Sequence, residues 1–217
     1  MSDGVKPRRR YDSSRRQEQA GENRRAMLEA ARHMFLARGY AATTVSAIAG
    51  EAGVSVETVY KAFGNKPGLV KAVVDVAIVG DDDSVPMVQR ELVRRIEAET
   101  DPRRKFAIYG EHLSLSAPRR VPVELLVRAA AASDPGAAGV REQLEGERLT
   151  GMGLFAQHLD EGGHLRPGVS VEEAQDVLWA CNSAELYDLL VLRRGWSPER
   201  YGRWVADTLS AALLPMS

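Results

Sequence analysis

The chain has 217 residues, 44% of them hydrophobic, and a formal net charge of −1. A chain of this length and apolar content can bury a core, which excludes a globally disordered protein. No apolar run reaches the roughly 18 residues that a spanning helix needs, and the single cysteine, Cys181, excludes an internal disulfide. We therefore expect a cytoplasmic protein with no membrane partner, no metal site and no cofactor.

The near-zero net charge conceals an uneven distribution of charge along the chain. Residues 1–70 contain 12 basic and 7 acidic side chains, whereas the remainder contains 17 and 23. A basic N-terminal part followed by an acidic remainder is typical of a nucleic-acid-binding domain joined to a domain of another kind. Ordinary surface scatter explains the same counts, so charge alone leaves both interpretations open.

Residues 1–21 form a polar, arginine-rich segment with almost no apolar side chain. Such a segment cannot bury enough surface to fold, so we predict a disordered basic arm. An arm of this composition can contact DNA phosphates or the minor groove. A solvated extension without a partner is the alternative.

A helix-turn-helix is predicted over residues 22–66. Apolar residues recur at helical spacing as far as Gly39, and two further short helices begin after the capping residues Thr44 and Ser55. Gly53 supplies the turn between them. A short second helix suffices, because only its first turn or two needs to reach base edges in a major groove about 12 Å wide. An ordinary hairpin within a helical bundle has the same pattern and is the alternative.

Residues 67–217 are predicted to form a larger helical domain. No strand pattern of convincing length occurs, so the predicted fold class is all-α. Capping signals mark three helix starts, at Asp101-Pro102, at Ser170 with Glu173, and at Ser197-Pro198. The first expected helix begins near residue 66 and ends at an acidic loop (81–86). The later ones span 87–100, 102–117, 121–133, 138–161, 170–194 and 198–214.

No catalytic or metal-binding constellation stands out among these helices. The stretch HLDEGGH (158–164) does not place its two histidines on one helix face, and its glycine pair is expected to end the helix between them. No nucleophile motif or phosphate-binding loop is present. We therefore do not expect an enzyme.

The sequence RRAMLEAARHMFLARGYAATTVSAIAGEAGVSVETVYKAFGNKPGL, within residues 24–70, resembles the DNA-binding region of the TetR family of transcriptional regulators. The resemblance implies that the second short helix enters the major groove. It also implies a homodimer on a palindromic double-stranded operator. By position it assigns DNA contacts to Thr44, Ser46, Ser55, Val56, Glu57, Thr58, Tyr60, Lys61 and Lys66.

Several of these assignments have a simpler structural explanation. Thr44 and Ser55 serve equally well as helix caps, and Tyr60 as a packing residue. The chain also departs from the family pattern, since Glu57 stands where a small residue is common and Ala62 where histidine is common. A carboxylate at position 57 can accept from cytosine N4 or repel phosphate, so the operator sequence is not readable.

Residues 171–214 resemble, more loosely, the last two helices of actinobacterial family members. The resemblance implies a four-helix dimer interface, and apolar residues on more than one face of these helices agree with it. A fully buried helix of a monomer is the alternative. The predicted interface residues are Val177, Leu186, Leu190, Tyr201, Trp204 and Leu209.

The middle helices surround an effector cavity in this family, which implies a small apolar or aromatic effector. Aromatic or polar residues on mostly apolar helices are the candidates for its lining. Taken singly, each of them is better explained as a core or surface residue. The candidates are Phe106, Tyr109, His112, Leu113, Leu126, Arg128, Phe155, Trp179 and Asn182.

Together these features predict a sequence-specific DNA-binding transcriptional regulator, a repressor that a small-molecule ligand releases from its operator. An activator or a ligand-independent DNA binder would have the same sequence features. A helical enzyme or carrier with a vestigial DNA head is a remote alternative, which the intact unit over 44–66 and the missing catalytic set both disfavour.

Overall fold

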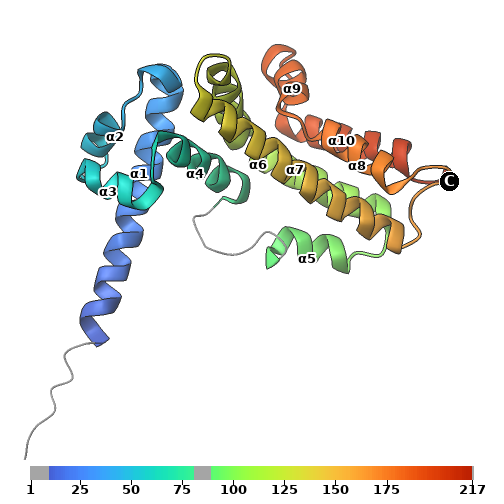
Figure 1. Cartoon of the computed structure of the whole chain (residues 1–217). Helices are drawn as coiled ribbons and strands as arrows, with labels where there is room; N and C mark the ends of the chain where they lie inside the picture. Colours follow the sequence, from blue (N-terminus) through green and yellow to red (C-terminus); the bar gives the residue numbers. More distant parts are fainter. Residues whose placement is uncertain (1–9, 81–88, 217) are drawn as a thin grey trace, which may run out of the picture. The chain divides into compact units, whose positions relative to one another are not determined.

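The computed structural model describes residues 10–80 and 89–216, and every regular element in these ranges is helical (Figure 1). The chain divides into two compact units, Met1–Val73 and Val74–Ser217. The predicted all-α fold, with a smaller N-terminal and a larger C-terminal helical part, is confirmed. None of the described helices has a stretch both long and apolar enough to span a bilayer.

The N-terminal unit is built on three helices and the start of a fourth. Its core takes one or more buried apolar residues from each, including Phe35, Ile48 and Val59. Thr43 is also buried, and its hydroxyl donates to the carbonyl oxygens of Gly39 (2.8 Å) and Met34 (3.1 Å). The helices are α1 (Arg10–Ala42), α2 (Val45–Glu51), α3 (Val56–Phe63) and α4 (Lys66–Val79).

Helix α1 differs from the sequence expectation at its N-terminal end and agrees with it at the other end. It begins at Arg10, so residues 10–21 are helical although we expected a disordered arm; residues 1–9 lie outside the described part. The helix continues because its straight-chain polar residues have good helix propensity, and Gln19 donates to the Asn23 side chain one turn later (3.2 Å). Near its other end, Gly39 has a φ of 81°, which breaks the helix where the sequence predicts its end.

The C-terminal unit has its core between α6, α7, α8 and α10. The three predicted capping signals are confirmed, since the side chains of Asp101, Ser170 and Ser197 each accept from a backbone N–H in the first turn. Its elements are α5 (Glu91–Ala98), α6 (Pro102–Ala131), α7 (Pro135–Glu161), α8 (Val171–Cys181), α9 (Ala184–Tyr187), the π-helical turn η2 (Asp188–Arg193) and α10 (Pro198–Leu213).

Helix α6 is one continuous helix where the sequence predicted two. The prolines Pro118 and Pro122 lie inside it and each removes a backbone hydrogen bond, at a cost of about 3 kcal/mol in an isolated helix. Burial of residues on both sides of the prolines, such as Leu113 and Val127, favours continuation. Over 170–194 the sequence predicted one helix and the structure has a break, because Ser183 caps a new helix there.

A buried lysine joins three helices at one end of this unit. Lys105 of α6 is 2% exposed, and its Nζ donates to the carbonyl oxygen of Ile96 at the end of α5 (2.7 Å). The same nitrogen lies 2.9 Å from Nε2 of His158 on α7. His158 therefore has an intramolecular partner, and burial lowers the pKa of both side chains.

Helices α6 and α10 cross at a pair of glycines. A Cβ atom added to Gly110 would overlap the carbonyl oxygen of Gly202, and one added to Gly202 would overlap that of Gly110. The backbones can approach this closely only because both positions lack a side chain. The crossing fixes how the aromatic core beside it packs, including Tyr201 and Tyr187, whose rings are 5.2 Å apart.

We expect Gly110→Ala to lower the free energy of unfolding by about 1–3 kcal/mol, because the methyl group must push two backbones apart. Urea denaturation at constant pH measures the change. Gly146→Ala on α7 is the matched control, because no atom lies near its added Cβ; it should stabilise by about 0.5–1 kcal/mol through helix propensity. Equal effects of the two substitutions would contradict the tight crossing.

Candidate functional site

Helices α2 and α3 are each fixed at the N-terminus by a side-chain cap. Thr44 Oγ1 accepts from the Ala47 N–H and Ser55 Oγ accepts from the Thr58 N–H, both at 3.1 Å. Gly53, with a φ of 67°, forms the turn between the helices. These local bonds satisfy N–H groups that a helix leaves unpaired, so both short helices are defined from their first residue.

The two sides of α3 differ sharply in exposure. Val59 is 1% exposed, whereas Val56 is 37% and Tyr60 is 49% exposed. Glu57 and Lys61 are exposed as well. We call Val56, Glu57, Tyr60 and Lys61 the reading face. An exposed valine and tyrosine on a helix held by its opposite side can make contacts to base edges or sugars, and Lys61 adds a charge for phosphate.

Glu57 and Thr58 have local structural roles in addition. Glu57 lies in the first turn of α3, where a carboxylate stabilises the helix dipole by roughly 0.3–1 kcal/mol. Thr58 is half-buried, and its hydroxyl lies 2.8 Å from that of Ser55. The hydroxyls of Ser55 and Thr58 are thus engaged with each other at the start of the helix.

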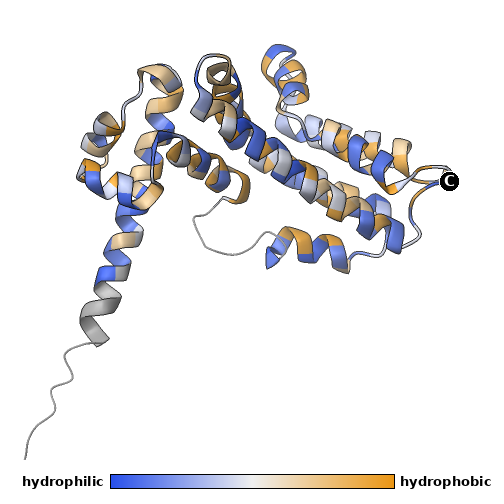
Figure 2. Cartoon of the chain, viewed as in Figure 1, coloured by the Kyte–Doolittle hydropathy of each residue, from blue (hydrophilic) through white to orange (hydrophobic). Residues whose placement is uncertain are grey.

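Lys66 stands at the start of α4, close to the end of α3. Its Nζ lies 4.1 Å from the centroid of the Tyr40 ring, a cation–π contact that holds the charge in position. Asn65 caps α4 by accepting from the Gly68 N–H at 2.7 Å. A lysine beside a capped helix N-terminus favours an anion such as phosphate. Figure 2 shows mostly hydrophobic residues along α4 and mostly hydrophilic residues in the first coloured turns of α1.

The predicted DNA contacts thus lie on one short stretch of chain. Thr44 and Ser46 are exposed at the start of α2, the reading face follows on α3, and Lys66 opens α4. Arg24 is not among the predicted contacts, but its guanidinium lies 4.6 Å from the Phe63 ring and brings another positive charge to the end of α3. The available signal was its place in the basic part of α1.

The nine predicted effector residues fall into three groups in the C-terminal unit. Phe106, Leu113, Tyr109 and Phe155 are buried, and the last two have ring centroids 5.6 Å apart. Arg128 is exposed and forms an ion pair with Glu185. The half-buried residues are His112, Leu126, Trp179 and Asn182.

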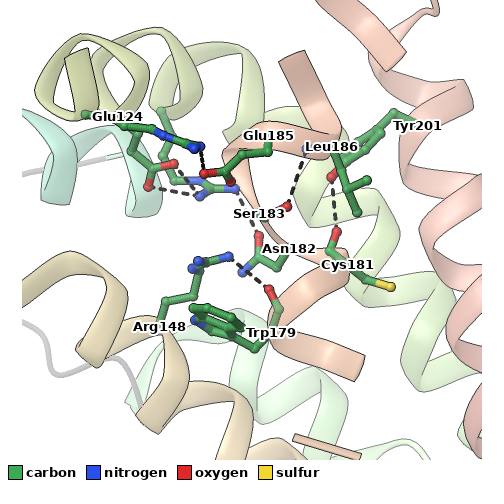
Figure 3. Close-up of polar contacts among 11 residues, drawn as sticks. Glu124, Arg148, Trp179, Cys181, Asn182, Ser183, Glu185, Leu186 and Tyr201 are labelled. Atoms are coloured by element: carbon green, nitrogen blue, oxygen red, sulfur yellow. Dashed lines mark hydrogen bonds and ion pairs between the residues drawn. The ribbon is translucent and has the colours of Figure 1, made fainter. Parts of the chain in front are cut away.

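Two arginines that sequence analysis did not select join this set. Arg120 is 5% exposed and donates to Glu124 and Asn182, and Arg148 packs on the ring of Trp179 (Figure 3). The signal for the first was an arginine pair enclosed by two prolines, Pro118 and Pro122. Burial, together with the positive charges of Arg120 and Arg119, lowers the pKa of His112 to about 4.

An open groove of about 330 Å³ runs along α6 and α10 beside the glycine crossing. None of the nine predicted effector residues lines it. Its walls are the small residues of the crossing and the polar side chains of Glu111, Ser114, Glu199, Arg203 and Asp207.

The predicted dimer residues divide by burial. Tyr201 and Leu209 are 1% and 0% exposed within the protomer, so they have almost no surface left for a partner. The Tyr201 hydroxyl also donates to the Cys181 carbonyl oxygen at 3.1 Å (Figure 3). The half-buried members are Val177, Leu186, Leu190 and Trp204.

Two exposed leucines extend the apolar surface beside these residues. Leu189 and Leu192 of η2 are 49% and 51% exposed. These leucines are not among the predicted interface residues, because the segment was expected to be a regular helix and forms a π-helical turn.

Comparisons with known proteins agree with this architecture. Residues 27–73 match the family model described as bacterial regulatory proteins, tetR family. A comparison with curated proteins gives no significant match.

Solved structures match over most of the chain. NalD of Pseudomonas aeruginosa, the secondary repressor of the MexAB-OprM multidrug efflux pump, is 22% identical, with a TM-score of 0.71 over 92% of this chain and 100% of that one. The fatty acid degradation regulator FadR of Bacillus halodurans is 18% identical, with a TM-score of 0.67 over 85% and 96%. A Saccharomonospora viridis protein solved with choline is 19% identical, with a TM-score of 0.63 over 89% and 98%. At these identities the likeness concerns the fold.

We expect Ser55→Ala to lower the free energy of unfolding by about 1 kcal/mol, because it removes the N-cap of α3. Ser46→Ala is the matched control: Ser46 is exposed and caps no helix. Thermal and urea unfolding of both variants measures the difference. Equal stability of the two variants would show that the Ser55 cap contributes nothing.

We expect acid to destabilise the protein partly through His112. Its pKa is about 4 when folded against 6.5 for a free histidine, so the unfolded chain binds more protons between these values. The free energy of unfolding therefore falls as the pH drops from 6.5 to 4, by up to about 1.4 kcal/mol per pH unit from this group. His112→Gln should flatten the dependence relative to the unsubstituted protein. Urea denaturation of both proteins across this range is the test.

Proposed function

We propose that this chain, which belongs to the tetR family of bacterial regulatory proteins, is a homodimeric repressor that a small-molecule effector releases from a palindromic operator. One observation carries the proposal: the capped unit of α2 and α3 presents the reading face to solvent, within the residues that match the family model. Repressor activity is stated for NalD, which shares the fold. A cytoplasmic location follows from this role.

Each part of the head has a role in DNA binding. The reading face of α3 lies in the major groove, where Val56 can contact a thymine methyl group and Glu57 can accept from cytosine N4. Thr44, Ser46 and Lys66 contact phosphates and set the register of the helix. Phosphate contacts carry no sequence information, so specificity rests on the first turn of α3.

A dimer gives this small head its affinity. Two copies of α3 held roughly 34–36 Å apart read two half-sites one DNA turn apart. The half-buried apolar residues of α8, α9 and α10, together with Leu189 and Leu192, supply the surface for a symmetric interface. Val177, Leu186, Leu190 and Trp204 are its proposed members.

Helix α4 connects the head with the effector domain. The boundary between the compact units falls within it, after Val73. Its C-terminal part is held by α6, because Arg119 Nε lies 3.5 Å from the Ala77 carbonyl oxygen and its guanidinium packs beside Gly80. An effector that favours another arrangement of α6 would release this end of α4. A coupling of about 1–3 kcal/mol changes operator affinity roughly 5- to 150-fold.

Selection of bound sequences from a random duplex pool, with the full-length protein, tests the proposed function. We expect enrichment of a palindrome with half-sites about one helical turn apart, and affinity that falls steeply with salt. A protein that retains no duplex at low salt would overturn the proposal. Enrichment of a single half-site would overturn the dimer.

We expect Arg119→Gln to change operator affinity at least about fivefold in the absence of effector, because the C-terminal end of α4 loses its tie to α6. Hydrogen exchange of residues 76–80 should rise at the same time. Arg104→Gln, at an exposed position of α6, is the matched control and should leave both unchanged. Unaltered affinity and exchange in Arg119→Gln would locate the coupling elsewhere.

A further inference from the structure

Two buried or half-buried arginines meet near the contact of α6, α7 and α8, and only one of them is neutralised. Arg120 donates from Nη1 to both carboxylate oxygens of Glu124 (2.9 and 2.8 Å) and from Nη2 to Asn182 Oδ1 (2.9 Å). This pair balances its own charge and is almost fully buried.

Arg148 of α7 is the arginine without a balancing charge. Its guanidinium carbon lies 4.7 Å from the Trp179 ring centroid, and Nη1 donates to the Trp179 carbonyl oxygen at 2.9 Å (Figure 3). Among the residues that the structure describes, no carboxylate forms an ion pair with it. A guanidinium has five N–H groups, so most of its donor capacity has no protein acceptor. Burial lowers the pKa of Arg148, and the charge of Glu124, which already pairs with Arg120, opposes this shift.

Two other donors in the same part of the core lack a good acceptor. The Tyr109 hydroxyl donates only to the thioether sulfur of Met152, at 3.4 Å, and sulfur is a weak acceptor. Trp179 Nε1 is buried and has no acceptor among the described residues. Buried donors in folded proteins nearly always have a hydrogen-bond partner. The described residues give these two donors no good acceptor, so an acceptor atom of a ligand would complete their hydrogen bonding.

We infer that this junction binds an organic monoanion, a carboxylate carried on an apolar body, with Arg148 as the ion-pair partner and Tyr109 and Trp179 as further donors. The apolar body would lie against the aromatic side chains next to Tyr109. The Phe155 ring packs edge-on at 5.6 Å from that of Tyr109, so these rings must separate to admit it. Met152 is unbranched and flexible, so it can leave the Tyr109 hydroxyl to the stronger acceptor. Binding of the anion does not depend on the proposed function. Only its role as the effector rests on the proposed function.

The charges around the site select against other ligand classes. A cationic ligand would add to the positive charges of Arg148 and Arg120, and Arg120, with Arg119, already opposes protonation of His112. A neutral amide could accept hydrogen bonds but would leave Arg148 without a counter-charge. An anion supplies both the acceptor atoms and the negative charge. Charge-assisted hydrogen bonds to a planar guanidinium are among the strongest in proteins.

The same stretch of α6 offers a route from the anion to α4. Arg120 faces the buried cluster, and its neighbour Arg119 holds the Ala77 carbonyl oxygen. Pro118 and Pro122 flank the two arginines, and each removes a backbone hydrogen bond. An anion that draws Arg120 away from Glu124 therefore acts on the least hydrogen-bonded part of the helix.

Binding to the full-length protein, measured by calorimetry without DNA at constant ionic strength, tests the inference. The probes are octanoate, octanamide, octylamine and acetate. The first three carry a negative, a neutral and a positive group on the same hydrocarbon tail, and acetate keeps the carboxylate without the tail. We expect octanoate to bind at least about tenfold more tightly than octanamide, and octylamine and acetate not to bind measurably. Octanoate no tighter than its amide, or acetate as tight as octanoate, would overturn the site.

Two variants locate the site. Arg148→Met keeps the bulk of the side chain and should weaken octanoate roughly 10- to 100-fold, while Arg141→Met, four residues from Glu145 on the same helix, should not. Tyr109→Phe removes only the hydroxyl and should weaken octanoate severalfold, which keeps the test decisive if Arg148→Met folds poorly. Wild-type affinity in both variants would overturn the inference.

The two proposals fail in different experiments. Octanoate binding is measured without DNA, so its loss in the variants is independent of whether the head binds a duplex. Octanoate binding that leaves operator affinity unchanged would overturn the anion as effector, whereas failure of the duplex selection would overturn the proposed function and leave the site itself standing.

Discussion

Burial of one side of α3 fixes what its other side can do. Val59 is inaccessible in the same small core as Ile48 of α2 and Phe35 of α1, so α3 cannot rotate without exposing apolar surface. Fewer than a dozen residues of helix then suffice to present a defined set of side chains. Remove the anchoring, and the caps at Thr44 and Ser55 would hold two helix ends with no fixed orientation between them.

The C-terminal unit combines a tightly packed helix crossing with a buried polar cluster whose donors are incompletely paired. The contact of Gly110 with Gly202 brings two long helices as close as backbones allow. A short distance along α6, the arginine cluster places charge in the core, which costs stability unless every group is paired. Arg148 and the donors beside it are not fully paired, and such imperfectly satisfied groups concentrate where a protein binds something.

Helix α6 takes part in both the glycine crossing and the arginine cluster. Its middle is interrupted by two prolines, yet packing on both sides keeps it continuous. The arginine pair between the prolines contacts the buried cluster on one side and the end of α4 on the other. A helix weakened locally but anchored at its ends can bend at one place, which is the property that a two-state coupling element requires.

Features set by a few neighbouring residues were determined by the sequence alone. The Ser55 cap and the break at Gly39 depend on groups within one helical turn, and the all-α class depends on periodicity, so each prediction held. Only the tertiary structure decided that α6 runs through Pro118, that Tyr201 turns into the protomer's own core, and that Arg148 lacks a counter-charge. These outcomes depend on contacts between segments far apart in the chain, whose packing energies outweigh local propensity and leave no periodic trace in the sequence.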